Sequence, residues 1–346
     1  MRKLLFVLAA MAIMGACSKD EVIKKSEASA VGFSNIFINN STRSVEDHSY
    51  TKQTLGKFEV YGTITNKSGM TSNIFNQEKV WEAVVNDKTT WVYDAANTQY
   101  WIPANTYNFT AIADGNVVDK VDQEVKVTEV TTGSYNMPKT IELYDASKQR
   151  DILYAESNPI AYVSGEKTVE FTFSHLMSKA KFTFKNEIAT NSGYSYKIKN
   201  VKITNAQKAG SYSVEKEGWY LIEDASLQSA SYELDFGNVV ANQSDMPAGQ
   251  TVTAEAFDLG YGMQRESYFE RLLVPTPAVE GVKTYVSVKF KCEVYKSGIL
   301  IDTQVKEVSA QVKLLPGNAY NLVVALGNPG EPIRFTVHDI NGWVNN

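Results

Sequence analysis

The sequence predicts an all-β protein made of β-sandwich domains. Apolar and polar residues alternate with a period of two along most of the chain, as in strands that have one face on a core and the other in water. Helical periodicity is nearly absent. The 19 tyrosines and 15 phenylalanines add β propensity and large apolar areas for a core.

The amino-terminal residues predict an export signal. Arg2 and Lys3 precede the apolar run Leu4–Met14, which is too short for a permanent span because spanning takes about 20 apolar residues. The run ends in Met14-Gly15-Ala16-Cys17, which resembles a bacterial lipobox, although Leu is commoner at its first position. We therefore predict that residues 1–17 form a lipoprotein signal peptide and that Cys17 becomes the lipidated first residue.

Residues 18–30 are polar and charged and predict a tether between the membrane and the folded body. The stretch Lys19-Asp20-Glu21 resembles the acidic tag that directs lipoproteins of Bacteroidetes to the outer face of the outer membrane. The expected location is therefore the cell outer membrane, facing outward. The alternative, an uncleaved signal anchor, is disfavoured by the residues that flank the apolar run.

Charge and cysteine content narrow the class of protein further. Removal of Arg2 and Lys3 with the signal takes the formal charge from −5 to −7, so no basic footprint for nucleic acid is expected. Only Cys292 then remains besides the lipidated residue, which excludes an intramolecular disulfide. Because Cys292 lies in an alternating run with apolar residues at every even position, we expect a buried, unreactive thiol.

The alternating runs predict strands in order along the chain. A change of parity after Ile198 indicates a bulge or a turn near Asn200. The predicted strands include 33–38, 169–173, 180–184, 194–198, 286–294, 320–326 and 333–337.

The length of 346 residues favours one or two domains. From His175 onward the strands become longer and richer in Lys and Val, which places a boundary close to Ser174. We therefore expect an N-terminal sandwich over residues 31–174 and a C-terminal sandwich over residues 175–346.

Catalytic, metal and cofactor chemistry are poorly supported. His48, His175 and His338 are scattered and have no metal-ligand spacing. Three further patterns are better explained by structure than by chemistry: a Ser-x-x-Lys match without its partner motifs, a lone glycine pair without a strand-to-helix context, and two aspartates expected at a solvated surface. These are Ser178–Lys181, Gly260–Gly262, and Asp145 with Asp151. We predict a protein that is not an enzyme and has no cofactor.

An ordered series of short segments resembles the fimbrillin family of Bacteroidetes, in particular its minor-fimbria-like branch. The segments cover nearly the whole mature chain in the family's order. They are Val31–Ile38, Ser41–Arg43, Phe58–Gly62, Ile74–Asn76, Trp91–Tyr93, Tyr100–Pro103, Tyr107–Ala111, Asp151–Ala155, Phe173–Phe182, Pro316–Tyr320 and Trp343.

The resemblance implies two β-sandwich domains with a transthyretin-like topology, in a shaft, tip or anchor subunit of an adhesive surface fibre. The expected partners are other fimbrial subunits that add a β-strand to an open sheet edge, the outer membrane through the lipid, and a host or bacterial surface ligand. Ligand contacts would be expected in loops such as 114–126 and 241–247. The run Ile333–Trp343 is either an exchanged strand or, as we favour, the last strand of its own domain.

The resemblance also implies that a surface protease acting after arginine removes the first strand. The matching residue is Arg43, in a polar segment that follows the first predicted strand. Arg43 is the only arginine between the signal and Arg150. A plain surface arginine in a loop is the favoured explanation, and Arg43 is a candidate processing site beside it.

The competing hypothesis is a carbohydrate-binding surface lipoprotein of a glycan-uptake system. Trp81, Trp91 and Trp101 would stack sugars if they shared one exposed face. Their neighbours favour core packing instead, since Trp91 and Tyr93 share a strand face and the segment Asp94–Asn97 predicts a hairpin turn that brings Trp101 alongside.

Overall fold

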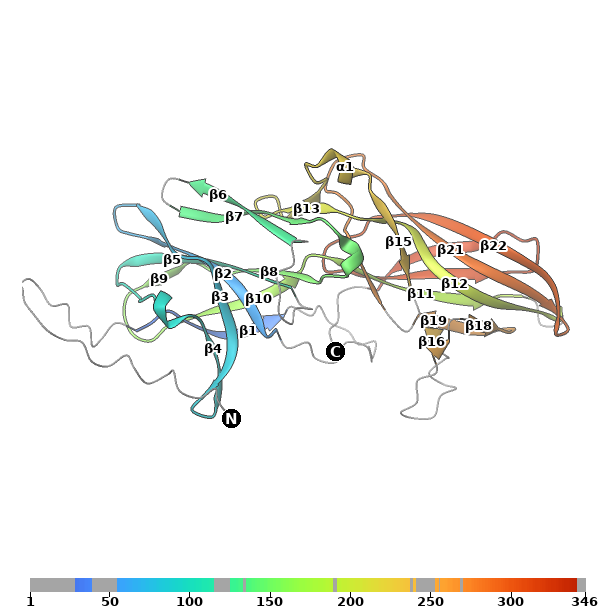
Figure 1. Ribbon diagram of the computed structural model, residues 1–346, viewed down its shortest axis with the longest axis horizontal. Helices are drawn as coiled ribbons and strands as arrows, with labels where there is room; N and C mark the ends of the chain where they lie inside the picture. The colour runs from blue at the N-terminus through green and yellow to red at the C-terminus, as the bar shows by residue number, and fades with distance from the viewer. Residues whose placement is uncertain are drawn as a thin grey trace, which may run out of the picture.

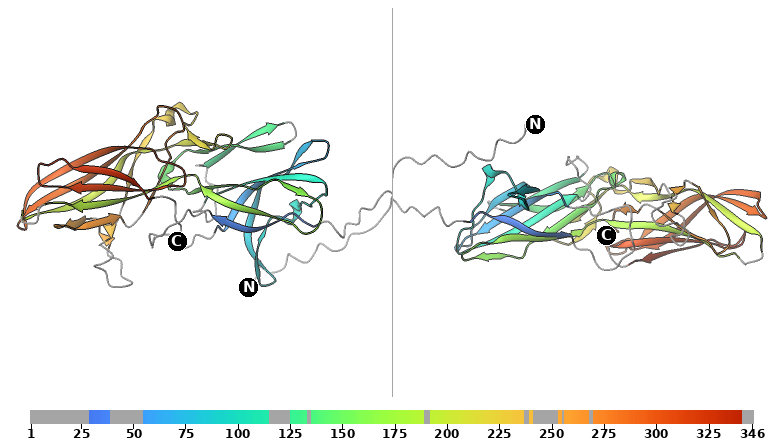
Figure 2. Two further views of the ribbon diagram at one scale, coloured as in Figure 1. Left: turned by 180° about the vertical axis from the view of Figure 1, so that it is seen from behind. Right: turned by 90° about the horizontal axis from the view of Figure 1, so that it is seen from below.

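The computed structural model confirms the all-β prediction. The chain folds into an elongated body in which an N-terminal sheet and a pair of C-terminal sheets lie end to end (Figures 1 and 2). The structure describes residues 29–38, 55–114, 125–132, 135–188, 192–236, 239–240, 253–254, 256–267 and 270–340.

The N-terminal sheet is antiparallel throughout its described strands except where its first strand pairs with β10. Its inner face carries one apolar core rich in phenylalanine and tyrosine. The order is β1 (Gly32–Ile38), β10 (Thr168–His175), β8 (Ile152–Glu156), β5 (Asn105–Asp114), β2 (Lys57–Thr65), β3 (Thr71–Val85) and β4 (Lys88–Val92), with β9 (Ile160–Tyr162) beside β5.

Two sheets face each other in the C-terminal half and enclose a second core. The β11 sheet contains β17 (Thr253–Ala254), β16 (Val239–Val240), β19 (Gln264–Ser267), β11 (Ser178–Asn186), β23 (Ala319–Leu326) and β24 (Arg334–Asp339), with β20 (Arg271–Leu273) beside β11. The β12 sheet contains β15 (Ser231–Asp235), β12 (Tyr194–Gln207), β21 (Thr284–Lys296) and β22 (Ile299–Val312), with β18 (Ala256–Leu259) beside β12.

The alternation of apolar and polar residues determines which face of each strand is buried. Strand β10 alternates exposed and buried residues along its full length, and Val169, Phe171 and Phe173 enter the core. The predicted bulge in β12 is confirmed, because Asn200 has a positive φ of 54° and the register with β21 shifts between Lys199 and Lys202.

A smaller shared sheet joins the two halves. It runs β14 (Gly218–Tyr220), β13 (Gly210–Ser213), β7 (Tyr135–Leu143) and β6 (Val125–Thr132), so β7 from before residue 174 pairs with β13 from after it. Three single helical turns complete the described elements: η1 (Ala95–Asn97), η2 (Ala146–Lys148) and α1 (Ala225–Gln228). The predicted domain boundary near Ser174 stays a prediction.

Trp219 packs at the junction between the N-terminal and C-terminal halves. Its side chain is 1 % exposed, and its indole Nε1–H donates to the Leu176 carbonyl oxygen at 2.6 Å, directly after β10. Gly210 lies against the ring, and a Cβ built there would meet Trp219 and Val274 atoms at 2.9 Å. The third core cluster therefore packs residues of both halves into one unit.

Cys292 is buried in the C-terminal core, as the sequence predicts. Desolvation by burial raises the pKa of its thiol to about 12, from an ordinary value of 9.0. At neutral pH the folded chain therefore holds a neutral, poorly nucleophilic thiol.

We expect the substitution Trp219→Ala to lower the free energy of unfolding by about 3–5 kcal/mol, because it opens a cavity in a core shared by both halves. Trp81→Ala is the matched control: this tryptophan is 41 % exposed, and its loss should cost about 0.5 kcal/mol. Urea titrations followed by circular dichroism measure both values. Equal costs for the two substitutions would contradict this account of the junction.

In a chain that carries Cys17→Ser, we expect Cys292 to react with a thiol reagent at pH 8 about a hundredfold or more slowly when folded than in urea. The sign follows from the raised pKa: the unfolded thiol ionises from about pH 9, whereas the folded thiol stays neutral until about pH 12. Absorbance kinetics with and without denaturant measure the ratio. A fast reaction of the folded chain would show that the thiol is accessible.

Candidate functional site

The first strand is the most distinctive feature of the N-terminal half. β1 runs parallel to β10 at the end of the sheet, in a register from Gly32 opposite Thr168 to Ile38 opposite Phe173. It lies along β10 in both views of Figure 2. Although only residues 39–56 separate β1 from β2 in the chain, the strands β10, β8 and β5 lie between them in the sheet.

On the side away from β10, hydrogen bonds hold the residues that lead into β1. The Val31 amide donates to the Gln99 carbonyl at 2.8 Å, and the Trp101 amide donates to the Ser29 carbonyl at 3.0 Å. The Tyr93 hydroxyl donates to the Val31 carbonyl at 2.8 Å. The amino end of β1 is thus bonded on both sides and closes the gap between β10 and the segment after β4.

Phe33 is the anchor of the strand. Its side chain is 4 % exposed, and Val31 beside it is 1 % exposed. The Phe33 ring lies with centroid distances of 5.7–6.4 Å from five other rings, those of Phe58, Phe75, Tyr93, Phe109 and Phe171. We call the surface formed by these five rings the β1 groove, because a strand that fills the place of β1 must cover it.

A bulge interrupts β1 at Asn35. This residue has a positive φ of 49°, and the register with β10 shifts between Ser34 and Ile36. Two polar contacts lie on the outer side: Ser34 Oγ and Thr168 Oγ1 are 2.6 Å apart, and the Asn35 amide donates to Glu170 Oε1 at 2.5 Å. Asparagine tolerates the left-handed region better than most residues, so Asn35 suits the backbone conformation of the bulge.

Beyond the bulge the strand is held loosely. Phe37 is 60 % exposed, and Ile36 and Ile38 are only half-buried. The attachment of β1 is therefore concentrated at Val31 and Phe33.

The last described strand, β24, lies at the edge of the β11 sheet. It pairs antiparallel with β23, which confirms the interpretation of residues 333–337 as a strand of their own half. Its inward residues Ile333, Phe335 and Val337 pack on the C-terminal core but remain half-buried. On the outer side Arg334 forms an ion pair with Glu187.

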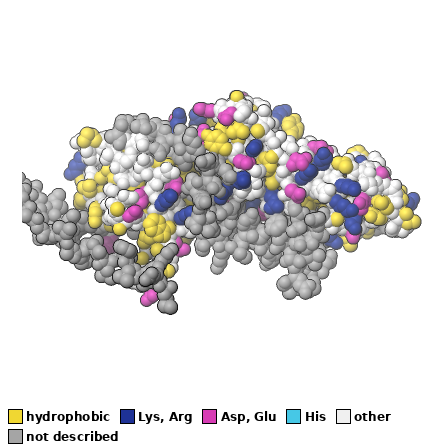
Figure 3. All heavy atoms as spheres, in the orientation of Figure 1, with side chains coloured by type: hydrophobic (Ala, Val, Ile, Leu, Met, Phe, Trp, Pro, Cys, Tyr) yellow, Lys and Arg dark blue, Asp and Glu magenta, His cyan; other side chains and the backbone are white. Residues whose placement is uncertain are grey.

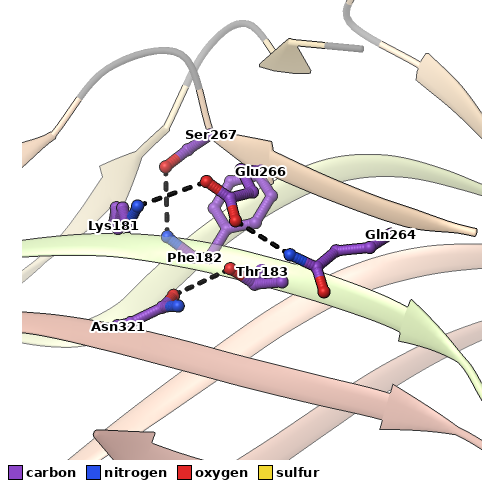
Figure 4. A network of polar contacts seen from close by, with 7 residues as sticks. All are labelled: Lys181, Phe182, Thr183, Gln264, Glu266, Ser267 and Asn321. Atoms are coloured by element: carbon purple, nitrogen blue, oxygen red, sulfur yellow. Dashed lines mark hydrogen bonds and ion pairs between the residues drawn. The ribbon is translucent and has the colours of Figure 1, made fainter. Parts of the chain in front are cut away.

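A polar network crosses the outer face of the β11 sheet (Figure 4). Lys181 Nζ lies 3.2 Å from Glu266 Oε2, and Thr183 donates to Asn321 at 2.9 Å, so the network links β19, β11 and β23. Ser178, the other half of the Ser-x-x-Lys match, donates instead to the Leu315 carbonyl at 2.9 Å. The arrangement ties strands together and does not pair Ser178 with Lys181.

Asp151 is placed differently from the prediction. Asp151 was expected in a solvated surface group, yet it is buried and lies 2.9 Å from His175 Nδ1, where β10 ends at the junction. Asp145 caps η2 by accepting from Ser147. Sequence reasoning missed the His175–Asp151 pair because only the pairing of β10 with β8 brings the two residues together. Among the described residues no group of three or more His, Cys, Asp and Glu side chains could hold a metal ion.

The three tryptophans do not form one platform. Trp101 is 2 % exposed and packs on Tyr107, and Trp91 packs on Phe58 at 5.2 Å. Trp81 is 41 % exposed, so core packing is confirmed for Trp101 and Trp91 but not for Trp81. The predicted hairpin turn was wrong. Asp94 caps η1, and Tyr100 then forms an isolated antiparallel β-bridge with Ala30, because the segment that leads into the first strand lies beside it.

Several predicted features lie outside the described residues. These are Cys17, Arg43, His48, Trp343 and nearly all of the tether and of the two candidate ligand loops. Among the described elements, no helix is long and apolar enough to cross a membrane. Positive and negative side chains lie interspersed on the face seen in Figure 3.

Comparisons with known proteins agree with this architecture. A crystal structure of a fimbrial protein from Bacteroides vulgatus superposes with a TM-score of 0.60 at 17 % identity, over 91 % of this chain and 99 % of that one. A putative cell adhesion protein from Bacteroides ovatus matches with a TM-score of 0.49 at 16 % identity, over 92 % and 98 % of the two chains. No curated protein matches the sequence. The family model described as fimbrillin-like matches residues 42–343. The chain therefore belongs to the fimbrillin-like family.

Proposed function

We propose that this chain is a structural subunit of a cell-surface fimbria, exported as a lipoprotein and assembled by addition of a β-strand from a neighbouring subunit. Membership of the fimbrillin-like family and the fold shared with a fimbrial protein support the subunit role. The observation that supports the assembly mechanism is the position of β1 at the sheet edge, with Phe33 among five aromatic rings.

β1 is suited to replacement because it is an edge element. Over most of its length it forms a ladder with β10 alone, so its departure breaks one ladder and leaves the rest of the N-terminal sheet paired. Its loss would expose the five rings of the β1 groove and the free edge of β10. Apolar surface and unpaired backbone groups together favour insertion of another strand.

Processing at Arg43 would supply the trigger. A cut after Arg43 separates residues 1–43, which contain lipidated Cys17 and β1, from the rest of the chain. In this scheme the lipid holds the precursor at the outer membrane until the cut, and the processed chain is a shaft subunit. A tip or an anchor subunit would keep its lipid and its first strand.

Among the described strands, β24 is the best candidate for the donor strand. Val31-Gly32-Phe33-Ser34 is matched by Ile333-Arg334-Phe335-Thr336, and Val337 then corresponds to Ile36 once the bulged Asn35 is left out. The match ends at Val337. Because β24 lies at a sheet edge and is bonded to β23 alone among the described strands, its departure breaks a single ladder.

Burial favours the transfer of this strand. Phe335 is half-buried in its own subunit, whereas a side chain in the place of Phe33 is almost fully buried among five rings. Each additional 40 Å² of apolar surface removed from water contributes about 1 kcal/mol. We propose domains over residues 31–174 and 175–346, in which the first receives the strand and the second donates it.

We expect Arg43→Ala to abolish assembly on the native cell surface. Without the cut, β1 stays in its groove and no acceptor edge opens, so the recovered chain should begin at acylated Cys17 and remain monomeric. Intact-mass analysis and native gel electrophoresis measure both properties. Arg150→Ala is the matched control and should leave the mass and the assembly of the processed chain unchanged. High-mass assemblies formed by the Arg43→Ala chain would contradict the trigger.

We expect Phe335→Ser to reduce assembly of cleaved chains at least about tenfold, because the donor then lacks the aromatic side chain that fills the β1 groove. Phe37→Ser is the control, since Phe37 leaves with the first strand and is 60 % exposed. Thermal unfolding of the uncleaved chains checks that both variants fold. Normal assembly of a folded Phe335→Ser chain would rule out β24 as the donor.

A further inference from the structure

We infer that Glu170, at the rim of the β1 groove, selects the incoming strand by pairing with Arg334 of a second copy of this chain. The inference rests on the proposed strand addition and names the residues that set its register. Both side chains point outward in the present structure, and both already have polar partners that the exchange would replace.

The outer rim of the groove is formed by β10. Thr168 and Glu170 are exposed and lie on the same side of this strand, because Val169 between them is buried. In the present structure Ser34 contacts Thr168, and Asn35 at the bulge donates to Glu170. Removal of β1 therefore leaves one hydroxyl and one carboxylate without these partners.

The place of Gly32 can hold a side chain. A Cβ built on Gly32 meets only Thr168 Cγ2 at 3.7 Å, which is ordinary van der Waals contact, and no positive φ requires glycine there. A donor in the register that puts Phe335 in the place of Phe33 puts Arg334 in the place of Gly32. Arg334 then lies opposite Thr168 and on the same face as Glu170.

The donor also fits the rest of the rim. Thr336 takes the place of Ser34 and brings a hydroxyl back to Thr168, whose present contact is hydroxyl to hydroxyl. Because the donor has no residue that corresponds to Asn35, the amide that now binds Glu170 is absent. Neighbouring residues on one face of a strand are about 7 Å apart, which an arginine side chain spans. The guanidinium of Arg334 thus replaces the Asn35 amide at Glu170.

Arg334 has an acidic partner both before and after the proposed strand exchange, so the exchange does not leave its guanidinium unpaired. At home Arg334 is held by the partly exposed carboxylate of Glu187. In the assembled state it would be held by Glu170 of the neighbour. A donor strand shifted by one residue would point Phe335 outward and lose both the aromatic contact and the ion pair.

A charge swap tests the inference. Full chains are cleaved after Arg43 with an arginine-specific protease, and polymer length is measured on native gels for the wild type, Glu170→Lys, Arg334→Glu and an equal mixture of the two variants. Each variant alone places like charges together and should assemble about fivefold more slowly, the effect expected for partly exposed ion pairs. The mixture restores opposite charges at every junction and should assemble at the wild-type rate as an alternating copolymer.

Glu280→Lys is the control, since it makes the same charge change at an exposed turn position that belongs to neither β10 nor β24. Circular dichroism of the uncleaved chains verifies folding. If the wild type assembles and both charge variants assemble equally fast, or if mixing restores nothing, the Glu170–Arg334 pairing is wrong while strand addition stands. If even the cleaved wild type stays monomeric, strand addition itself fails and the inference fails with it.

Discussion

The insertion of Phe33 among five aromatic rings is the contact on which the N-terminal half depends. The rings come from β2, β3, β5, β10 and the residue after β4, so a single side chain touches most of the sheet. The inward residues of those strands pack in the same apolar core. In the described structure the chain's own first strand completes the sheet and supplies Phe33 as the central ring.

The junction between the halves determines what such an insertion can do mechanically. Trp219, Leu176 and the strands β7 and β13 tie the N-terminal half to the C-terminal half through one shared sheet and one apolar cluster. Force applied to β24 is consequently transmitted to the N-terminal sheet through packed side chains and backbone hydrogen bonds. A fibre subunit needs this continuity, because a loosely linked pair of domains would extend under load before the strand contacts resist it.

Local features could be predicted from the sequence, and pairings between distant segments could not. The alternation of β10, the bulge at Asn200 and the burial of Cys292 follow from side-chain periodicity within a few residues. The parallel pairing of β1 with β10 joins residues 134 positions apart, and the buried pair of His175 with Asp151 depends on which strands become neighbours. Periodicity carries no signal for either. The β1 groove was accessible only through family resemblance, and its rim residue Glu170 has nothing in its own sequence context that marks it.

Side-chain chemistry distinguishes the β1 edge, where we propose strand addition, from the long edge strand β22. β22 also has one partner strand, and Ile299, Leu300 and Ile301 near its start are exposed. However, Lys306 lies on the same side as Val308, opposite Phe290 of β21, so a strand pairing there would have to accommodate a charge beside apolar residues. Inward-pointing charges on edge strands oppose edge-to-edge association. The β1 groove has no such charge among its five rings, and its polar residues lie outside on the rim. Of these two edges, β22 carries a charge that opposes a further strand, and the β1 edge is closed by the chain's own first strand, whose removal is proposed above.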